Sequence, residues 1–146
     1  MQTLALAADH GGFELKEIIK QFLQDAGAYQ ILDLGTNSAD PVDYPAYGRK
    51  AAEAVAGGQA ERGIIFCGTG IGISIAANKV KGIRAANCLT EFMAEMSRRH
   101  NDANILALGG RTVEPELAQK IVKVWLNTPF AGGRHERRVK QLDALD

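Results

Sequence analysis

The chain has 146 residues, enough for one domain with a substantial core, and its 17 basic residues balance 17 acidic ones. This balance argues against a general nucleic-acid binder and against a binder of anionic membranes. No apolar stretch is long enough to span a bilayer, and the first residues lack the basic start and cleavage site of a signal peptide. Cys67 and Cys88 lack metal-site spacing. We therefore expect one cytoplasmic domain over residues 1–146 with free thiols, a disulfide between the two cysteines being the alternative.

Apolar runs alternate with amphipathic stretches along the whole chain. In chain order we predict a strand at 4–8, a helix at 13–26, a strand at 29–34, a helix at 44–56, a strand at 63–66, a helix at 74–80, a strand at 83–87, a helix at 90–99, a strand at 105–108, and helices at 114–126 and 135–145. In the first helix, the apolar residues fall on one face and Gly27 suits the C-cap. Such regular alternation predicts a parallel sheet with helices on both faces.

Four short segments directly follow predicted strands. They are residues 9–12, 35–36, 67–72 and 109–111. In an open parallel sheet, ligands bind beyond the carboxyl ends of the strands. We therefore expect these four segments to converge on one edge of the sheet.

The third of these segments carries a cysteine followed by glycines at alternate positions, Cys67-Gly-Thr-Gly-Ile-Gly. Glycines let backbone N–H groups approach a ligand closely, and the start of a helix attracts anions and favours the thiolate form of a cysteine. The spacing fits neither nucleotide-binding glycine motif, and Ile73 stands where a Cys-x5-Arg phosphatase loop needs arginine. A small buried hydrophobic residue is the alternative interpretation of Cys67.

Three other groups of side chains are candidates. Asp9 and His10 either cap the following helix or handle a substrate hydroxyl or phosphate. His100 can exchange protons near neutral pH. Arg134 and Arg138 are four residues apart on one helix face and could grip a phosphate, although a solvated helix face explains them too. The three histidines show no paired spacing, so no metal site is predicted.

Six motifs in this chain also occur, in the same order, in a known family. They are ADHGGF (8–13), DYP (43–45), CGTGIGISIAANK (67–79), GIRA (82–85), RHNDAN (99–104) and GGRHxxRV (132–139, where x is any residue). They resemble the type B ribose-5-phosphate isomerases, which are grouped with allose-6-phosphate and galactose-6-phosphate isomerases. The resemblance implies a Rossmann-like three-layer α/β/α sandwich with a five-stranded parallel sheet. It also implies a homodimer, or a dimer of dimers, with sites at the subunit interface.

The resemblance implies aldose–ketose isomerisation through a cis-enediolate, without metal or cofactor. Cys67 matches the base that moves a proton between C1 and C2, and Thr69 matches the residue that assists it. His100 matches the acid/base that opens the furanose ring, with Asp9 beside the ring oxygen or hydroxyls. The remaining matches are substrate contacts: His10, Arg134 and Arg138 at the phosphate, and Gly68, Gly70, Ile71, Gly72, Asn101 and Arg111 around the sugar and the enediolate oxygen.

The preferred substrate is a five-carbon sugar phosphate, with ribose 5-phosphate and ribulose 5-phosphate as the interconverted pair. Residues 89–93 do not align with a substrate-contact motif and could tune the length of sugar accepted, so a six-carbon phosphate is the alternative. A non-catalytic sugar-phosphate-binding module is a second alternative. A chain that contributes only part of a hetero-oligomeric site is a third, weakened because both Cys67 and His100 are present.

Overall fold

The computed structural model describes residues 1–145, in which strands and helices alternate. The strands are β1 (Gln2–Ala8), β2 (Tyr29–Asp33), β3 (Arg62–Cys67), β4 (Ala85–Asn87) and β5 (Ile105–Gly109). The helices are α1 (Phe13–Ala26), α2 (Tyr44–Ala56), α3 (Ile71–Asn78), α4 (Glu91–Arg99), α5 (Pro115–Asn127) and α6 (Arg134–Asp143). Within these residues, no helix combines the length and the apolar character needed to cross a membrane.

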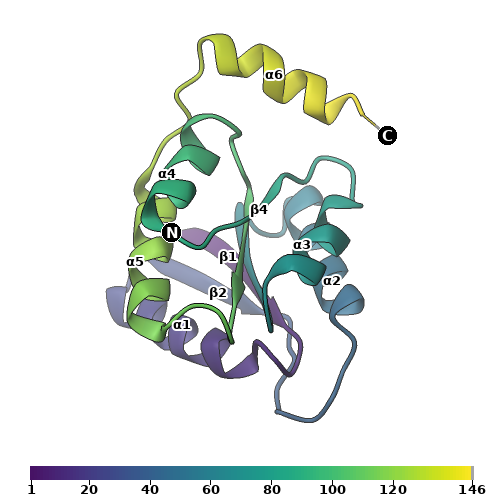
Figure 1. Cartoon of the computed structure of the whole chain (residues 1–146), viewed down its shortest axis with the longest axis vertical. Helices are drawn as coiled ribbons and strands as arrows, with labels where there is room; N and C mark the ends of the chain where they lie inside the picture. The colour runs from purple at the N-terminus through teal and green to yellow at the C-terminus, as the bar shows by residue number, and fades with distance from the viewer. Residues whose placement is uncertain (146) are drawn as a thin grey trace.

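The strands pair in parallel in the order β2-β1-β3-β5-β4. Figure 1 shows α1, α4 and α5 on one side of this sheet and α2 and α3 on the other. Side chains alternate between the two faces of a strand. One set packs under α1, α4 and α5 and includes Leu4, Leu6, Ile64, Phe66 and Leu106. The other set packs under α2 and α3 and includes Ala5, Ala7, Ile65, Cys67 and Ala107. The predicted three-layer α/β/α sandwich with a five-stranded parallel sheet is confirmed.

The predicted element boundaries hold best where capping residues are clear. Helices α1 and α2 have the predicted bounds, and Gly27 ends α1 in the left-handed conformation with φ of 72°. Helix α3 begins at Ile71, three residues before the predicted start, because Gly70 serves as its N-cap with φ of 81°. Strand β4 begins at Ala85 rather than at residue 83, because the Arg84 N–H donates to the Asn104 side chain instead of joining the sheet.

A buried lysine ties α1 to the end of β2. Lys16 is fully buried, and its Nζ donates to both oxygens of Asp33 at 2.7 and 2.9 Å. Lys20 adds a third bond at 2.9 Å, and the Gly35 N–H donates to Asp33 at 3.0 Å. Burial opposes ionisation of Asp33, but these hydrogen bonds outweigh it and lower the pKa of Asp33 below 3.8. The carboxylate therefore stabilises the turn that carries Gly35 to the edge of the sheet.

We expect Asp33→Asn to lower the free energy of unfolding by about 3 kcal/mol, because it leaves the buried Lys16 ammonium with only Glu17 as a counter-ion. Since the pKa of Asp33 is lowered by folding, its contribution is present above pH 3.8 and is lost as the pH falls through the folded-state value. Denaturant unfolding at pH 7 and below pH 4 measures both effects. Glu53→Gln, which breaks an exposed pair with Arg49, is the matched control and should change stability by less than about 0.5 kcal/mol.

Candidate active site

The four strand-end segments converge on the carboxyl edge of the sheet, as predicted. The Ala8 N–H donates to Gly35 O at 2.7 Å, and the Asp9 N–H donates to Phe66 O at 3.1 Å. On the other side of β3, two bonds tie the glycine loop to the end of β5. They are Gly110 N–H to Cys67 O at 2.8 Å and Arg111 N–H to Gly68 O at 2.9 Å. This backbone network places Asp9, Cys67 and Arg111 around one point.

Cys67 ends β3 with its thiol turned into the glycine loop. Its side chain is buried, and its Sγ accepts a hydrogen bond from the Gly70 N–H at 3.1 Å. Thr69 lies on the exposed side of the loop, where its Oγ1 accepts from the Ile71 N–H at 3.1 Å. The sulfur therefore faces a backbone donor at the start of α3.

Asp9 and His10 both bond the backbone while keeping polar atoms free. Asp9 is buried, and its Oδ1 accepts from the Gly12 N–H at 3.1 Å. The capping interpretation is therefore right for one oxygen, although the N-cap position itself is Gly12. His10 Nδ1 lies 3.1 Å from both the N–H and the carbonyl oxygen of Val42, so the ring bonds this backbone in either tautomer. Nδ1 therefore anchors the ring, and Nε2 is the nitrogen left for a ligand.

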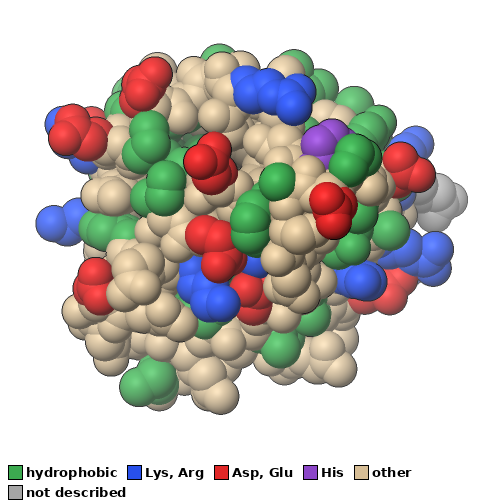
Figure 2. Space-filling view, turned by 90° about the horizontal axis from the view of Figure 1, so that it is seen from below, with side chains coloured by type: hydrophobic (Ala, Val, Ile, Leu, Met, Phe, Trp, Pro, Cys, Tyr) green, Lys and Arg blue, Asp and Glu red, His purple; other side chains and the backbone are tan. Residues whose placement is uncertain are grey.

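The same edge brings a cation and a phenol to the loop. An added Cβ at Gly68 would lie 3.1 Å from a guanidinium nitrogen of Arg111, so this side chain lies across the loop. An added Cβ at Gly72 would lie 2.8 Å from the ring of Tyr44. Figure 2 views the molecule from this side and shows acidic and basic side chains interspersed, with hydrophobic side chains around a histidine. The edge is therefore locally mixed in charge, with Arg111 as the cation nearest the glycines.

A second cluster forms at the opposite end of the molecule. His100 follows α4, and its ring stacks on that of His135 with centroids 4.2 Å apart and planes at 14°. Burial and the positive charges of His100, Arg134 and Arg138 lower the pKa of His135. Figure 1 shows α6, which carries His135 and both arginines, lying along the top of the molecule. Arg134 and Arg138 are exposed, as is Asn101 beside His100.

One chain does not bring these two clusters together. Cys67 pairs with Gly109 at the carboxyl edge, whereas Gly63 pairs with Ile105 at the amino edge, about 13 Å away along the strands. His100 lies beyond that amino edge, five residues before Ile105. The predicted site residues therefore form two half-sites, one around Cys67 and one around His100.

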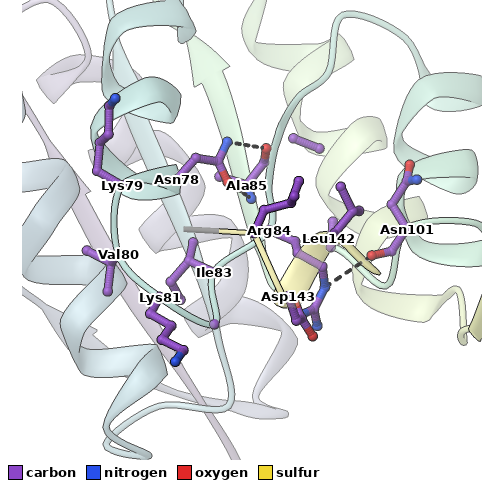
Figure 3. Close-up of a pocket in the computed structure, with 14 residues that line it drawn as sticks. Asn78, Lys79, Val80, Lys81, Ile83, Arg84, Ala85, Asn101, Leu142 and Asp143 are labelled. Carbon is purple, nitrogen blue, oxygen red and sulfur yellow. Dashed lines mark hydrogen bonds and ion pairs between the residues drawn. The ribbon is translucent and has the colours of Figure 1, made fainter. Parts of the chain in front are cut away.

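A cavity of about 560 Å³ lies beside the second cluster, between the segment from α3 to β4 and the end of α6. Figure 3 shows the Arg84 side chain in it, between Asn101 and Asp143. Arg84 Nε donates to Asn101 O at 3.2 Å, and its guanidinium bonds both oxygens of Asp143 at 2.8 and 3.0 Å. Arg84 thus ties α6 to the turn after His100. The sequence interpretation gave Arg84 no role of its own, although it lies in the GIRA motif.

The described residues contain no group of three or more His, Cys, Asp and Glu side chains arranged to hold a metal ion. The polar side chains at the carboxyl edge include the thiol of Cys67, the carboxylate of Asp9, the imidazole of His10, the guanidinium of Arg111, the phenol of Tyr44 and the hydroxyl of Thr69. Together with the loop amides, they suit an anionic substrate that exchanges a proton.

Comparison with known proteins gives the class of this chain. Ribose-5-phosphate isomerase B of Escherichia coli is 48% identical over 146 residues, which cover 100% of this chain and 97% of that protein. The structure of Clostridium thermocellum ribose-5-phosphate isomerase B superposes with a TM-score of 0.95 and 55% identity, covering 97% of this chain and 95% of that one. D-erythrulose-4-phosphate isomerase of Pectobacterium atrosepticum is 40% identical, with 97% and 93% covered.

These relatives and the α/β fold define a sugar-phosphate isomerase, an enzyme of the aldose–ketose isomerase class. Residues 4–142 match the Ribose/Galactose Isomerase family, and the chain belongs to it. The family predicted from the six motifs is therefore confirmed.

Proposed function

We propose that this protein interconverts ribose 5-phosphate and ribulose 5-phosphate through a cis-enediolate, with Cys67 as the base. The observation that carries the proposal is the Cys67 Sγ, which accepts the Gly70 N–H at the carboxyl edge of the sheet. The relatives from Escherichia coli and Clostridium thermocellum, both ribose-5-phosphate isomerases B, support the choice of substrate.

In this mechanism, the Cys67 thiolate takes the proton from C2 of the open-chain aldose. The electron pair moves onto the carbonyl oxygen at C1, and the enediolate that forms carries negative charge. The Gly70 and Ile71 N–H groups already donate to Cys67 Sγ and Thr69 Oγ1, so the backbone N–H groups of Gly68, Thr69 and Gly72 and the exposed Thr69 hydroxyl are the donors at hand for these oxygens. Preorganised donors of this kind stabilise such charge. The C2 hydroxyl proton then passes to O1, and return of the thiol proton to C1 as the C2 carbonyl forms yields the ketose and regenerates the thiolate.

The substrate reaches the site as a closed furanose, so an acid/base must first open the ring. We assign this step to His100 of the partner subunit in a homodimer. Two features support a shared site: the half-sites are at opposite ends of one chain, and exposed apolar side chains flank them, Ile71 and Ile75 at the glycine loop and Leu142 on α6. Asp9, buried beside the loop, would accept from a sugar hydroxyl.

The phosphate group requires cations away from C1 and C2. His10 offers Nε2 from the same chain as Cys67, and the tautomer whose Nδ1 accepts the Val42 N–H donates from Nε2 to the phosphate. The exposed Arg134 and Arg138 of the partner subunit lie one turn apart on α6 and would bind the phosphate oxygens. Arg111 and the partner's Asn101 would contact the sugar. Binding at this distance from the reacting carbons positions C1 and C2 against the thiolate.

The number of carbons in the sugar has one alternative. Leu89, Phe92 and Met93 are exposed at the start of α4, 46%, 68% and 40% respectively. They lie in the segment that the sequence left unassigned. The family name includes galactose isomerases, which keeps a six-carbon phosphate as the alternative substrate. The free thiols of Cys67 and Cys88 suit the cytoplasm, where we place the enzyme.

A substrate panel tests the assignment. Purified protein is assayed with ribose 5-phosphate, allose 6-phosphate, galactose 6-phosphate and D-erythrulose 4-phosphate under identical conditions with chelator. We expect the highest kcat/KM with ribose 5-phosphate, because the relatives from Escherichia coli and Clostridium thermocellum are ribose-5-phosphate isomerases B. Higher kcat/KM with another sugar phosphate would replace the substrate, and binding without turnover of any would establish a sugar-phosphate-binding module instead.

A further inference from the structure

Asn87, at the end of β4, lies against the glycine loop and was not singled out by the sequence. Its Nδ2 donates to Thr69 O at 3.3 Å. That carbonyl belongs to the Thr69–Gly70 peptide, whose N–H donates to Cys67 Sγ at 3.1 Å. One peptide group therefore connects the Asn87 amide to the thiol, with Asn87 at its oxygen and Cys67 at its nitrogen.

We propose that Asn87 is a positioning residue that favours the thiolate of Cys67 through the Thr69–Gly70 peptide. A donor on a peptide oxygen polarises the peptide and strengthens its N–H as a donor to an anion. The inference deepens the proposed function and rests on it for the catalytic role of Cys67.

The peptide has little freedom to turn away from this arrangement. An added Cβ at Gly109 would lie 2.6 Å from Thr69 O, and one at Gly70 would lie 2.6 Å from Asn87 Oδ1. Both positions require glycine, and Gly70 has φ of 81° as well. The peptide is therefore packed between the end of β5 and the Asn87 side chain, with its oxygen and N–H fixed in opposite directions.

The side-chain oxygen of Asn87 indicates that packing alone does not account for an asparagine at this position. Asn87 Oδ1 is buried and has no hydrogen-bond partner within residues 1–145. A buried acceptor without a partner destabilises a fold. An apolar side chain of the same size would avoid that cost, so the contribution of Asn87 lies in the bond from Nδ2.

The charged and titratable groups around the loop come from other elements. Asp9 follows β1, Arg111 follows β5, and Tyr44 and Tyr47 lie on α2. His10 bonds Val42 in the segment before α2. None of these groups is a hydrogen-bond partner of Asn87, whose side chain bonds Thr69 O, so a changed ionisation of the thiol would report on the peptide.

The test is the pH dependence of alkylation of Cys67 by iodoacetamide, followed by peptide mass spectrometry. In Asn87→Leu, which keeps the size and removes the donor, we expect the midpoint of the profile to rise by about half a pH unit. At pH values below the midpoint, the kcat of this variant for ribose 5-phosphate should be about threefold lower than that of the wild type, with KM changed little. In Asn87→Asp, the ionised carboxylate offers no donor and repels the thiolate, so the rise should be larger.

Asn78→Leu is the matched control. The Asn78 amide bonds both the N–H and the C=O of Ala85, at the other end of β4, so its loss should reduce stability and leave the midpoint unchanged. A wild-type midpoint in Asn87→Leu overturns the proposal. If that variant does not fold, a wild-type midpoint in Asn87→Asp overturns it equally. If the midpoint shifts in Asn87→Leu but Cys67→Ala keeps full activity, Asn87 influences the thiol through the Thr69–Gly70 peptide as proposed, but the proposed function of Cys67 is rejected.

Discussion

The Cys67→Ala variant should bind ribose 5-phosphate with near wild-type affinity and lose about 10²- to 10⁴-fold in kcat. The thiol ends β3 inside the glycine loop, and the residues assigned to the phosphate lie elsewhere, on His10 and on α6. Removing the sulfur therefore removes the proposed base and leaves the proposed phosphate contacts. Isothermal titration with ribose 5-phosphate measures binding, and a coupled assay measures turnover.

Cys88→Ala is the control for this experiment. Cys88 is also a buried cysteine, but burial raises its pKa to about 11, so it remains a thiol at neutral pH. It packs with the cluster under α1, α4 and α5, on the opposite face of the sheet from Cys67. The Cys88 variant should keep full turnover and the wild-type alkylation profile. Full turnover in Cys67→Ala would contradict the thiol base.

The layout of the fold and one half of the site follow from local sequence signals. Apolar alternation locates every strand, and the rule that ligands bind at the carboxyl ends of strands brings Asp9, Cys67 and Arg111 to one edge. The start of α3 was misplaced because Gly72 is a poor helix former, and the left-handed Gly70 allows the helix to begin before it. The spacing of the glycines therefore indicates a loop of functional interest, but it does not indicate where the following helix, α3, begins.

Long-range polar contacts are what the sequence does not reveal. Lys16 lies on an amphipathic helix, where a lysine is expected at the surface, yet it is fully buried. Its ammonium bonds Asp33, which is 17 positions away in the sequence. Arg84 bonds Asp143 across 59 positions. Asn87 was predicted only as a strand residue, and nothing in its neighbours indicates that its amide meets Thr69. Each contact depends on how distant elements pack, which no local pattern encodes.

The separation of the two half-sites, by contrast, follows from the topology of the fold. The sequence places His100 at a helix end, and in a parallel α/β fold a helix returns the chain to the amino edge. His100 and Cys67 must then lie at opposite ends of one chain, whatever their common chemistry. A second copy related by a two-fold axis repeats both half-sites and can place His100 of the partner subunit at each Cys67.

Mixing Cys67→Ala with His100→Asn should therefore restore activity that neither variant has alone. In a mixed dimer, one site carries both substitutions and the other carries neither. After random exchange, half of the dimers are mixed and each has one intact site, so about a quarter of wild-type activity should return. Co-expression with two different affinity tags isolates the mixed dimers, and the assay follows ribulose 5-phosphate.

The matched control pairs Cys67→Ala with Asp9→Asn. Both residues lie in the half-site at the carboxyl edge, so every site of that mixed dimer has one defective half and activity should stay at the level of the separate variants. Rescue by His100→Asn but not by Asp9→Asn requires that catalysis uses residues of two chains. Isolated mixed dimers without rescue would place the whole reaction within one chain, and His100, which follows α4, would then have to reach Cys67 along the roughly 13 Å length of the strands.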